Sequence, residues 1–263
     1  MRAGRQRRRR AGDALMGILE GKRALVTGAS GDIGGAIAKR LASEGAAVAC
    51  HGVPWETADA IVAELSARGH GAVAVCGNLT EDKATRECVA EAVEKLGGLD
   101  IVVNNAGVTK DALLIKMDEA AWDLVLEVNL FGAIRVTEAV LAALKASGDG
   151  RVINMASIVG LMGNAGQANY AASKAGLLSF TRMAARKLAP FGIKVNAIAP
   201  GFIQTRMTAG LPEKTREQLS RQIPLVRLGT PDDVASVCLF LSSPGAAYVT
   251  GQALAVDGGM VMA

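Results

Sequence analysis

The hydrophobic positions of this chain form short continuous runs that alternate with longer segments of helical periodicity. Each short run has the apolar character of a strand that is buried on both faces. The runs are Arg23–Thr27, Ala46–Cys50, Ala72–Cys76, Ile101–Asn104, Arg151–Met155, Lys194–Ile198 and Ala253–Val256. Between them, apolar residues recur at the spacing of one helix face. The segments with this spacing are Gly34–Ser43, Glu56–Arg68, Ala84–Leu96, Glu119–Lys145, Ala168–Leu188 and Asp232–Leu241.

This regular alternation predicts right-handed crossovers and a parallel sheet. We therefore expect an α/β fold, with a doubly wound, seven-stranded parallel sheet and helices on both faces. The chain has 263 residues, of which 50% are hydrophobic but only 3% are aromatic. That length suffices for one well-buried core, so we expect a single domain over residues 16–263. No apolar run approaches the roughly 18–20 residues of a membrane helix, and we expect no membrane span.

The net charge of +4 comes from the first residues of the chain. Residues 1–15 hold six of the 29 basic side chains and one of the 25 acidic ones, so the remainder is nearly electroneutral. Nucleic-acid binding requires a basic surface, and we do not expect it here. We expect residues 1–15 to form an Arg-rich, disordered and dispensable extension. Alternatively, residues 1–15 could be an organelle-targeting segment, or upstream sequence that precedes a natural start at Met16.

The cysteines and histidines argue against a metal site. Cys50, Cys76, Cys88 and Cys238 are scattered, no C-x-x-C pair occurs, and the chain has only two histidines. Zinc sites need clustered ligands. We therefore expect no metal, reduced and buried thiols, and a cytoplasmic location.

A glycine-rich turn joins the first predicted strand to the first predicted helix. Residues 28–35 read Gly-Ala-Ser-Gly-Asp-Ile-Gly-Gly. A strand, a glycine turn and a helix in this order are typical of dinucleotide-binding folds of the Rossmann type. The N–H groups and the positive dipole end of the helix can receive a pyrophosphate there. Taken alone, the motif could also be only a tight turn.

Ser157, Tyr170 and Lys174 form a second chemical motif. Tyr170 and Lys174 are four residues apart, so on a helix they share one face, with about 5–6 Å between their Cβ atoms. A phenol with a pKa of about 10 is a poor acid near neutrality, but a neighbouring ammonium group lowers that pKa. A nearby serine can donate a hydrogen bond to a carbonyl oxygen. The three residues predict proton exchange with an oxygen on carbon, which accompanies hydride transfer.

The chemically informative residues follow the carboxyl ends of predicted strands. Asn104–Gly107 closes the fourth strand, Ser157 follows the fifth, and Pro200-Gly201 follows the sixth. In doubly wound sheets, ligands bind beyond these ends. We therefore expect the three segments to converge on one active site.

Taken together, these motifs resemble those of the classical short-chain dehydrogenase/reductases, from about Leu19 to Ala263. The matching motifs are Thr27-Gly28…Gly34, Asn104-Asn105-Ala106-Gly107, Asn129, Ser157, Tyr170-x-x-x-Lys174, Pro200-Gly201 and Asp257-Gly258-Gly259. Within that family the chain is most similar to the 3-oxoacyl-(acyl-carrier-protein) reductases of fatty acid synthesis. This likeness is carried by Asn105–Met117, Trp122-x-x-x-x-x-x-Asn129, Pro200–Met207 and Thr250–Met260.

The resemblance implies a catalytic tetrad. Tyr170 would protonate the new hydroxyl group, and Ser157 would hold the ketone oxygen. Lys174 would bind the nicotinamide ribose and lower the pKa of Tyr170, while Asn129 would hold a water that passes protons between Lys174 and solvent. The cofactor contacts that the resemblance implies are Gly28, Ser30, Gly31, Asp32, Ile33, Gly34, His51, Asn78, Leu79, Asn105, Ala106, Gly107, Tyr170, Lys174, Pro200, Gly201, Ile203 and Thr205.

Three departures from the family pattern bear on the cofactor. Asp32 replaces the middle glycine of the turn; its carboxylate would repel a pyrophosphate but favour the helix as an N-terminal cap. Asn78-Leu79 replaces an Asp-Val pair beside the adenine. The second strand ends in Cys50-His51-Gly52, without the acid that NAD enzymes of this fold use, whereas Gly31 replaces a base that grips a 2′-phosphate. We expect NADP(H) to be preferred, with His51 as the nearby contact and NAD(H) not excluded.

The reaction that the resemblance implies is NADPH-dependent reduction of a 3-oxoacyl thioester to the (3R)-hydroxyacyl thioester. Acyl carrier protein is acidic, so a basic entrance would dock it, and the candidates are Lys110, Lys116, Arg151 and Arg206. Gln204–Leu225 would be a mobile lid over the acyl chain, with a short helix at Glu213–Arg221. The family also implies a homotetramer.

Two other functions stay open at this point. One is the reduction of acetoacetyl coenzyme A, or the interconversion of another ketone and secondary alcohol, by the same four residues. The other is a non-catalytic subunit that keeps the fold for assembly, a reading that only Asp32 supports.

Overall fold

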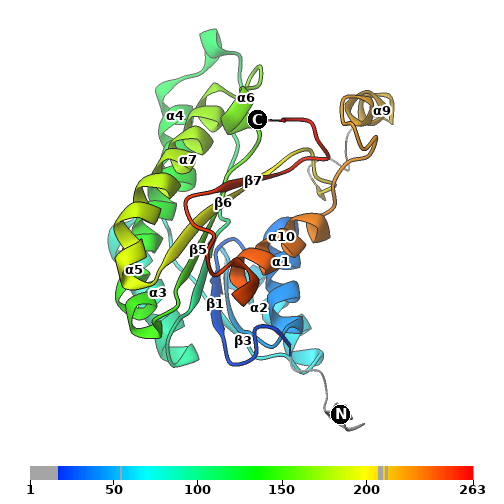
Figure 1. Cartoon of the computed structure of the whole chain (residues 1–263). Coiled ribbons are helices and arrows are strands. Elements are labelled where there is room, and N and C mark those ends of the chain that lie inside the picture. The colour runs from blue at the N-terminus through cyan, green and yellow to red at the C-terminus, as the bar shows by residue number, and fades with distance from the viewer. Residues whose placement is uncertain (1–16, 54, 207–209, 211–212, 263) are drawn as a thin grey trace, which may run out of the picture.

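The computed structural model describes residues 17–53, 55–206, 210 and 213–262, which build a seven-stranded sheet between two layers of helices (Figure 1). The strands are β1 (Arg23–Val26), β2 (Ala47–His51), β3 (Ala72–Val75), β4 (Ile101–Asn104), β5 (Arg151–Met155), β6 (Lys194–Pro200) and β7 (Ala253–Val256). They pair in parallel in the order β3-β2-β1-β4-β5-β6-β7. The order reverses between β1 and β4, which is where ligands of such sheets bind. The predicted fold class is confirmed.

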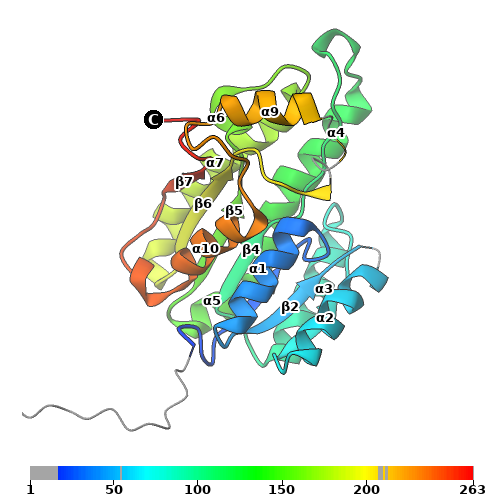
Figure 2. The same cartoon turned by 90° about the vertical axis from the view of Figure 1, so that its right-hand side faces the viewer.

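Helices cover both faces of the sheet (Figures 1 and 2). One face carries α1 (Asp32–Ser43), α2 (Trp55–Ala67) and α10 (Pro231–Ser242). The other carries α3 (Asp82–Leu96), α4 (Glu119–Leu126), α5 (Gly132–Ser147) and α7 (Ala168–Leu188). The shorter helices are α6 (Val159–Met162) and α9 (Glu213–Arg221), and 3-10 turns occur at Leu114–Lys116, Ala189–Phe191 and Pro244–Ala246.

Successive residues of β1 belong to two different hydrophobic layers, as the two-residue repeat of a strand requires. Ala24 and Val26 pack in the layer that contains Leu41 of α1. Leu25 packs in the layer that contains Val140 of α5. The core is built largely of Ala, Val, Leu and Ile side chains, and it fixes the end of β1 in the centre of the sheet.

The predicted helical segment Glu119–Lys145 is helical throughout, but a π turn that the sequence did not predict divides it. α4 ends at Leu126, a π-helical turn occupies Glu127–Phe131, and α5 begins at Gly132. A π turn inserts a residue into the helical repeat and is frequent at functional sites. Here it places Asn129 inside the protein, where it is 1% exposed. Hydrophobic periodicity did not reveal the turn because the apolar pattern continues across it.

The other elements follow the sequence-based bounds closely. β6 extends to Pro200 rather than Ile198, and α1 begins at Asp32 rather than Gly34. α9 spans Glu213–Arg221 as expected. Among the described residues, no helix combines the length and the apolar character needed to cross a membrane. The Arg-rich extension of residues 1–15 lies outside the described residues.

Candidate active site

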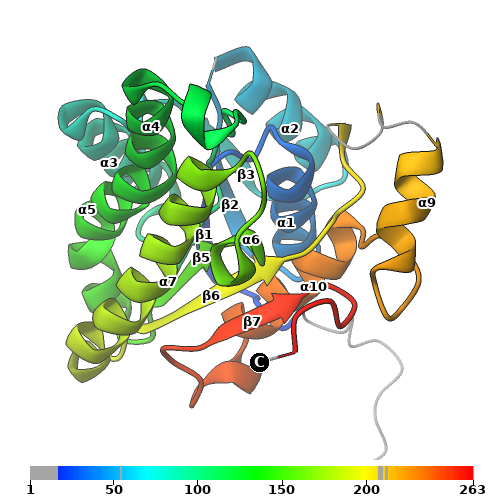
Figure 3. The same ribbon diagram turned by 90° about the horizontal axis from the view of Figure 1, so that it is seen from above.

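The loops after β1, β4, β5 and β6 meet at the carboxyl edge of the sheet, which Figure 3 shows from above. Thr27 and Asn105 join the first two loops. Thr27 Oγ1 accepts hydrogen bonds from the backbone N–H groups of Asn105 (2.9 Å) and Ala106 (3.0 Å). The Asn105 amide donates to the carbonyl oxygens of Thr27 (3.0 Å) and Gly28 (3.1 Å). The glycine turn is thus fixed where the strand order reverses.

Two glycines of the turn are required by close backbone contacts. Gly28 has a φ of 64°, and a Cβ there would lie 2.9 Å from Ala106 Cα. A Cβ at Gly34 would overlap the carbonyl oxygen of Gly28 and lie 2.6 Å from the Asn105 amide nitrogen. The turn presents the first N–H groups of α1, which have no partner within the helix, at the sheet edge. This donor set fits the pyrophosphate of a dinucleotide.

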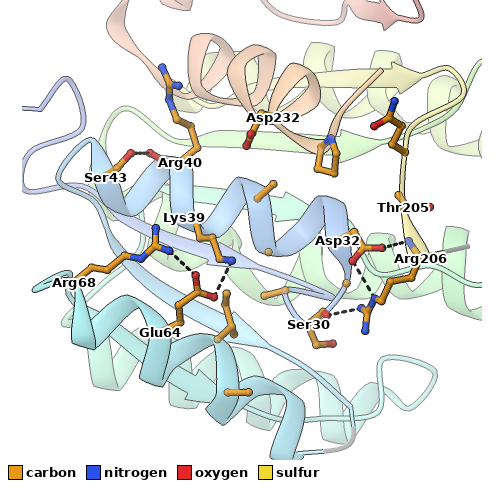
Figure 4. A pocket seen from close by; sticks show the side chains of 18 residues that line it. Ser30, Asp32, Lys39, Arg40, Ser43, Glu64, Arg68, Thr205, Arg206 and Asp232 are labelled. Atoms are coloured by element: carbon orange, nitrogen blue, oxygen red, sulfur yellow. Dashed lines mark hydrogen bonds and ion pairs between the residues drawn. The ribbon is translucent and has the colours of Figure 1, made fainter. Parts of the chain in front are cut away.

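Asp32 makes an ion pair that the sequence did not predict. The N-cap of α1 is Gly31 and no side chain caps this helix, so the expectation that Asp32 acts as the cap is wrong. Its carboxylate accepts hydrogen bonds from the backbone N–H of Arg206 (2.7 Å) and from Arg206 Nε (3.0 Å). Arg206 Nη2 also donates to the Ser30 carbonyl oxygen at 3.1 Å (Figure 4). A guanidinium therefore opposes the repulsion between Asp32 and a phosphate.

Ser157, Tyr170 and Lys174 come together beyond the end of β5. Ser157 follows that strand, and Tyr170 and Lys174 lie on α7. The Ser157 hydroxyl lies near that of Tyr170 and lowers the Tyr170 pKa. Lys174 Nζ lies 5.5 Å from the centroid of the Tyr170 ring and donates to the Met155 carbonyl oxygen at 2.8 Å. Two hydroxyl groups and an ammonium group can therefore reach one bound molecule.

Burial controls the ionisation of Tyr170 and Lys174. Desolvation raises the pKa of Tyr170, against the effect of the Ser157 hydroxyl, and the charge of Asp111 raises it further. Desolvation lowers the pKa of Lys174 to about 8. The expected lowering of the Tyr170 pKa by Lys174 is therefore not found in this structure, in which the ammonium group is directed to the Met155 carbonyl. Tyr170 holds its proton at neutral pH, as an acid must.

Asn129 binds the loop that follows β4. Its Oδ1 accepts from the Val108 N–H (2.7 Å), and its Nδ2 donates to the Val108 carbonyl (2.9 Å) and to Ser173 Oγ (3.2 Å). A Cβ at Gly107 would lie 3.1 Å from Asn129 Oδ1 and 3.6 Å from Lys174 Nζ. Asn129 and Lys174 therefore flank the same glycine, and the amide holds the loop beside Lys174, a use that the motif did not predict.

His51 and Asn78 engage their polar atoms within the protein. His51 is buried; its Nδ1 accepts from the Gly28 N–H (3.2 Å), so Nε2 carries the proton and donates to the Gly77 carbonyl oxygen (2.9 Å). Burial lowers the His51 pKa, which keeps the ring neutral. Asn78 is exposed and bonds with Thr80 and Glu81. Neither nitrogen of His51 is left for a phosphate, and the ring instead orients the glycine turn.

The segment after β6 reaches back to the glycine turn. The Pro200 carbonyl accepts from the Ile158 N–H at 3.1 Å, next to Ser157. Ile203 is buried and forms a bridge with Gly229. Thr205 lines the groove beside Asp32. The expected contacts Pro200, Gly201, Ile203 and Thr205 thus share an edge with the turn.

Two of the four cations expected to dock an acyl carrier do not fit that role. Arg151 is buried at the amino end of β5 and pairs with Asp149 at 2.6 Å, so its position corrects the expectation. Arg206 pairs with Asp32. Lys110 and Lys116 are exposed in the loop after β4.

Comparisons with known proteins agree with this arrangement. A family model described as enoyl-(acyl carrier protein) reductase matches residues 28–261. The chain belongs to the short-chain dehydrogenase/reductase family. Such enzymes use a nicotinamide cofactor, so the chain is an NAD(P)-dependent oxidoreductase.

Two proteins of known name resemble this chain over nearly their whole length. The chain is 46% identical over 244 residues to the 3-oxoacyl-(acyl-carrier-protein) reductase of Thermotoga maritima, covering 93% of this chain and 99% of that one. It is 47% identical over 244 residues to the protein of that name from Vibrio cholerae, with the same coverage. A solved structure from Sinorhizobium meliloti, described as a short-chain alcohol dehydrogenase, superposes with a TM-score of 0.88 at 39% identity, covering 92% and 97% of the two chains.

Proposed function

We propose that this protein reduces 3-oxoacyl thioesters of acyl carrier protein to (3R)-3-hydroxyacyl thioesters with NADPH, a step of fatty acid synthesis. The observation that carries the proposal is the proximity of Ser157, Tyr170 and Lys174 to one another, at the sheet edge that holds the glycine turn. Relatives named 3-oxoacyl-(acyl-carrier-protein) reductase, at 46% and 47% identity, support the substrate class.

In this mechanism the residues hold one carbonyl oxygen and protonate it. A nicotinamide cofactor, when bound, would supply the hydride for the carbonyl carbon. Ser157 donates a hydrogen bond to the oxygen, and Tyr170 transfers its hydroxyl proton to it, so that C=O becomes CH–OH. Lys174 holds the nicotinamide ribose and returns a proton to Tyr170. Asn129 lies beside Lys174, where it can hold the water that resupplies the proton.

The ionisation states suit reduction. Burial raises the Tyr170 pKa, so the phenol is protonated when the substrate arrives. Burial also lowers the Lys174 pKa to about 8, which brings this ammonium group close to the pH at which it can exchange protons. In the opposite direction, alcohol oxidation requires Tyr170 to accept a proton, and that direction needs a higher pH.

One feature of the chain favours NADPH over NADH. No acidic side chain stands at the end of β2, where NAD enzymes of this fold bind the ribose 2′-hydroxyl. The relatives' activity class supports a nicotinamide cofactor. His51, which is neutral and has both nitrogens engaged, is left out of the proposed phosphate contacts.

The surface beside the site fits an acyl chain on an acidic carrier. Leu113, Leu114 and Ile115 are exposed in the loop after β4, and Lys110 and Lys116 flank them. Apolar side chains would contact the acyl chain, and the two ammonium groups would attract the carrier. The segment Gln204–Leu225, which carries α9, is the proposed lid; its residues 207–209 and 211–212 lie outside the described residues.

We also propose that the protein is a homotetramer. Leu124 of α4, Phe131 of the π turn and Met183 of α7 are exposed apolar side chains on one helical layer. Association of that layer between subunits would remove them from water. Light scattering of the purified protein at several concentrations measures the mass directly, and a monomer would contradict the proposal.

The decisive experiment compares NADPH and NADH oxidation with acetoacetyl thioesters of acyl carrier protein and of coenzyme A. Turnover of the carrier-bound acetoacetyl group with NADPH is expected. A crotonoyl thioester tests the enoyl reduction that the family model's description names, and little turnover is expected. A preference for the coenzyme A thioester would favour an acetoacetyl-CoA reductase instead.

Tyr170→Phe tests the assigned acid. The substitution removes one hydroxyl and should lower kcat by about 10²- to 10⁴-fold, the range for losing a general acid, with nucleotide binding retained. Tyr248→Phe is the matched control, because Tyr248 is fully exposed on the surface. Nucleotide binding without turnover in the wild type would favour another ketone or alcohol. Absence of nucleotide binding would favour a non-catalytic subunit.

A further inference from the structure

The nucleotide site lacks a basic side chain of its own. Gly31 contributes no side chain, and Asp32 adds a negative charge to the first turn of α1. His51, at the end of β2, is neutral and holds Gly28 and Gly77 with its two nitrogens. A phosphate on the adenosine ribose would therefore meet no cation from the turn itself.

Arg206 brings a guanidinium to this position from a distant part of the chain. The residue lies 174 positions after Asp32. The Asp32 carboxylate accepts from both the backbone N–H and the Nε of Arg206, and Nη2 donates to the Ser30 carbonyl oxygen (Figure 4). The Arg206 side chain is nevertheless 77% exposed. Contacts within the described residues thus orient the guanidinium but leave most of its surface to a ligand.

The Nη2 contact with Ser30 extends the Arg206 side chain from Asp32, the first residue of α1, toward the ribose side of the turn. Ala29, the residue before Ser30, donates its N–H to the His51 carbonyl oxygen at 2.8 Å. Ala29 and Ser30 therefore lie beside the end of β2, where dinucleotides of this fold place the adenosine ribose. The pyrophosphate belongs instead at the N-terminal N–H groups of α1.

A groove of about 910 Å³ begins at this guanidinium and continues along α1. Farther along it, Lys39 and Arg68 both pair with Glu64, at 2.7 Å and 2.8 Å. Figure 4 shows Arg206 beside Ser30 and Asp32, away from those pairs. Among the described residues that line the groove, Arg206 is the cation that contacts the turn.

We infer that Arg206, oriented by Asp32, recognises the 2′-phosphate of NADP(H) and so sets the cofactor preference. The inference rests on the proposed function, because it requires a nicotinamide dinucleotide at this turn. A guanidinium offers N–H donors in a planar fork that matches phosphate oxygens. Asp32 plays two parts: it positions Arg206 and it competes with the phosphate for the same guanidinium.

Calorimetric titration of the full-length protein with NADPH and with NADH tests this assignment. Arg206→Gln should weaken NADPH binding by about 10-fold or more, the range for a lost charge-assisted pair, and change NADH binding by less than about 2-fold. Arg206→Lys keeps the positive charge but loses the planar guanidinium, so its NADPH affinity should lie between those of the wild type and Arg206→Gln. Arg40→Gln is the matched control: Arg40 lines the same groove away from the turn, and its loss changes the net charge equally.

The same comparison with adenosine 2′,5′-bisphosphate and 5′-AMP removes any influence of the nicotinamide. The Asp32→Asn variant tests the role of Asp32. It keeps an acceptor for Arg206 but removes the negative charge that competes with the phosphate, so it should strengthen NADPH binding more than NADH binding. A weaker NADPH affinity in Asp32→Asn would overturn the competition between Asp32 and the phosphate.

Two results with Arg206→Gln would overturn the assignment while leaving the proposed function intact. An unchanged ratio of NADPH to NADH affinity is the first. An equal loss of both affinities is the second, because Arg206 would then act on the pyrophosphate or on the segment after β6. If the wild type binds neither nucleotide, the proposed function itself fails.

Discussion

The catalytic cluster and the cofactor corner of this protein are held together in different ways. Tyr170 and Lys174 share one helix, four residues apart, and Lys174 is also fixed by a hydrogen bond to Met155 of the neighbouring strand. Asp32 and Arg206 lie 174 positions apart in the chain and form a pair in which Arg206 is largely exposed. Chemistry confined to one element is visible as spacing in a sequence. Chemistry shared between distant segments depends on where the fold places them.

The largest expected effect lies in the catalytic cluster. Ser157→Ala removes the hydroxyl beside Tyr170 and should lower kcat by about 10²- to 10³-fold, as loss of one oxyanion-type donor does. The affinity for NADPH, measured by titration, should stay within about 2-fold because the cofactor corner is untouched. A strong loss of nucleotide binding in this variant would show that the two regions are coupled.

A smaller effect, on stability, is expected in the glycine turn, where a side chain would clash with the backbone. Gly34→Ala should lower the free energy of unfolding by about 1–3 kcal/mol, the usual result of overpacking, because its Cβ overlaps the Gly28 carbonyl. Gly31→Ala is the matched control: its φ is −79°, and the nearest atom to the added Cβ is 3.4 Å away. Urea unfolding measures both. An equal loss of unfolding free energy in the two variants would contradict the close contact between Gly34 and the Gly28 carbonyl.

Sequence reasoning recovered the sheet because buried parallel strands are apolar throughout and glycines mark their ends. It also placed Ser157 and the Tyr170–Lys174 pair, since loop position and helical spacing determine where they lie. It missed the π turn at Glu127–Phe131, because the added residue leaves the apolar pattern unchanged.

The errors share one physical cause. Each side chain was expected to interact with residues close to it in the sequence, whereas the fold supplies other partners or surroundings. Asp32 was expected to serve its own helix, yet its carboxylate is satisfied by Arg206. Arg151 was expected at the entrance, yet it starts β5 at the opposite edge of the sheet, paired with Asp149. For Tyr170, the proximity of Lys174 was expected to dominate, and burial outweighs it.

The burial of Lys174 leads to the smallest effect, a change in how stability depends on pH. In the folded protein the Lys174 pKa is lowered from 10.5 to about 8. Between these values the unfolded chain binds a proton that the folded protein has lost, so rising pH favours the folded state. Lys174 should therefore add about 1–2 kcal/mol to the free energy of unfolding between roughly pH 8 and 9.5. The Lys174→Met variant should lack this pH-dependent increase in the free energy of unfolding.

The comparison must be between variants, since other groups titrate in the same range. Burial raises the pKa values of Cys50, Cys88 and Cys238 to about 12, and these thiols lower stability as pH rises. Their contribution is common to all variants. Urea unfolding at a fixed protein concentration and at several pH values gives the difference between wild type and Lys174→Met, with the exposed Lys83→Met as control. Parallel curves for wild type and Lys174→Met would mean that the ammonium group is solvated in the folded protein. In that case burial would not set the ionisation of the catalytic cluster, and the contrast with the exposed cofactor corner would fail.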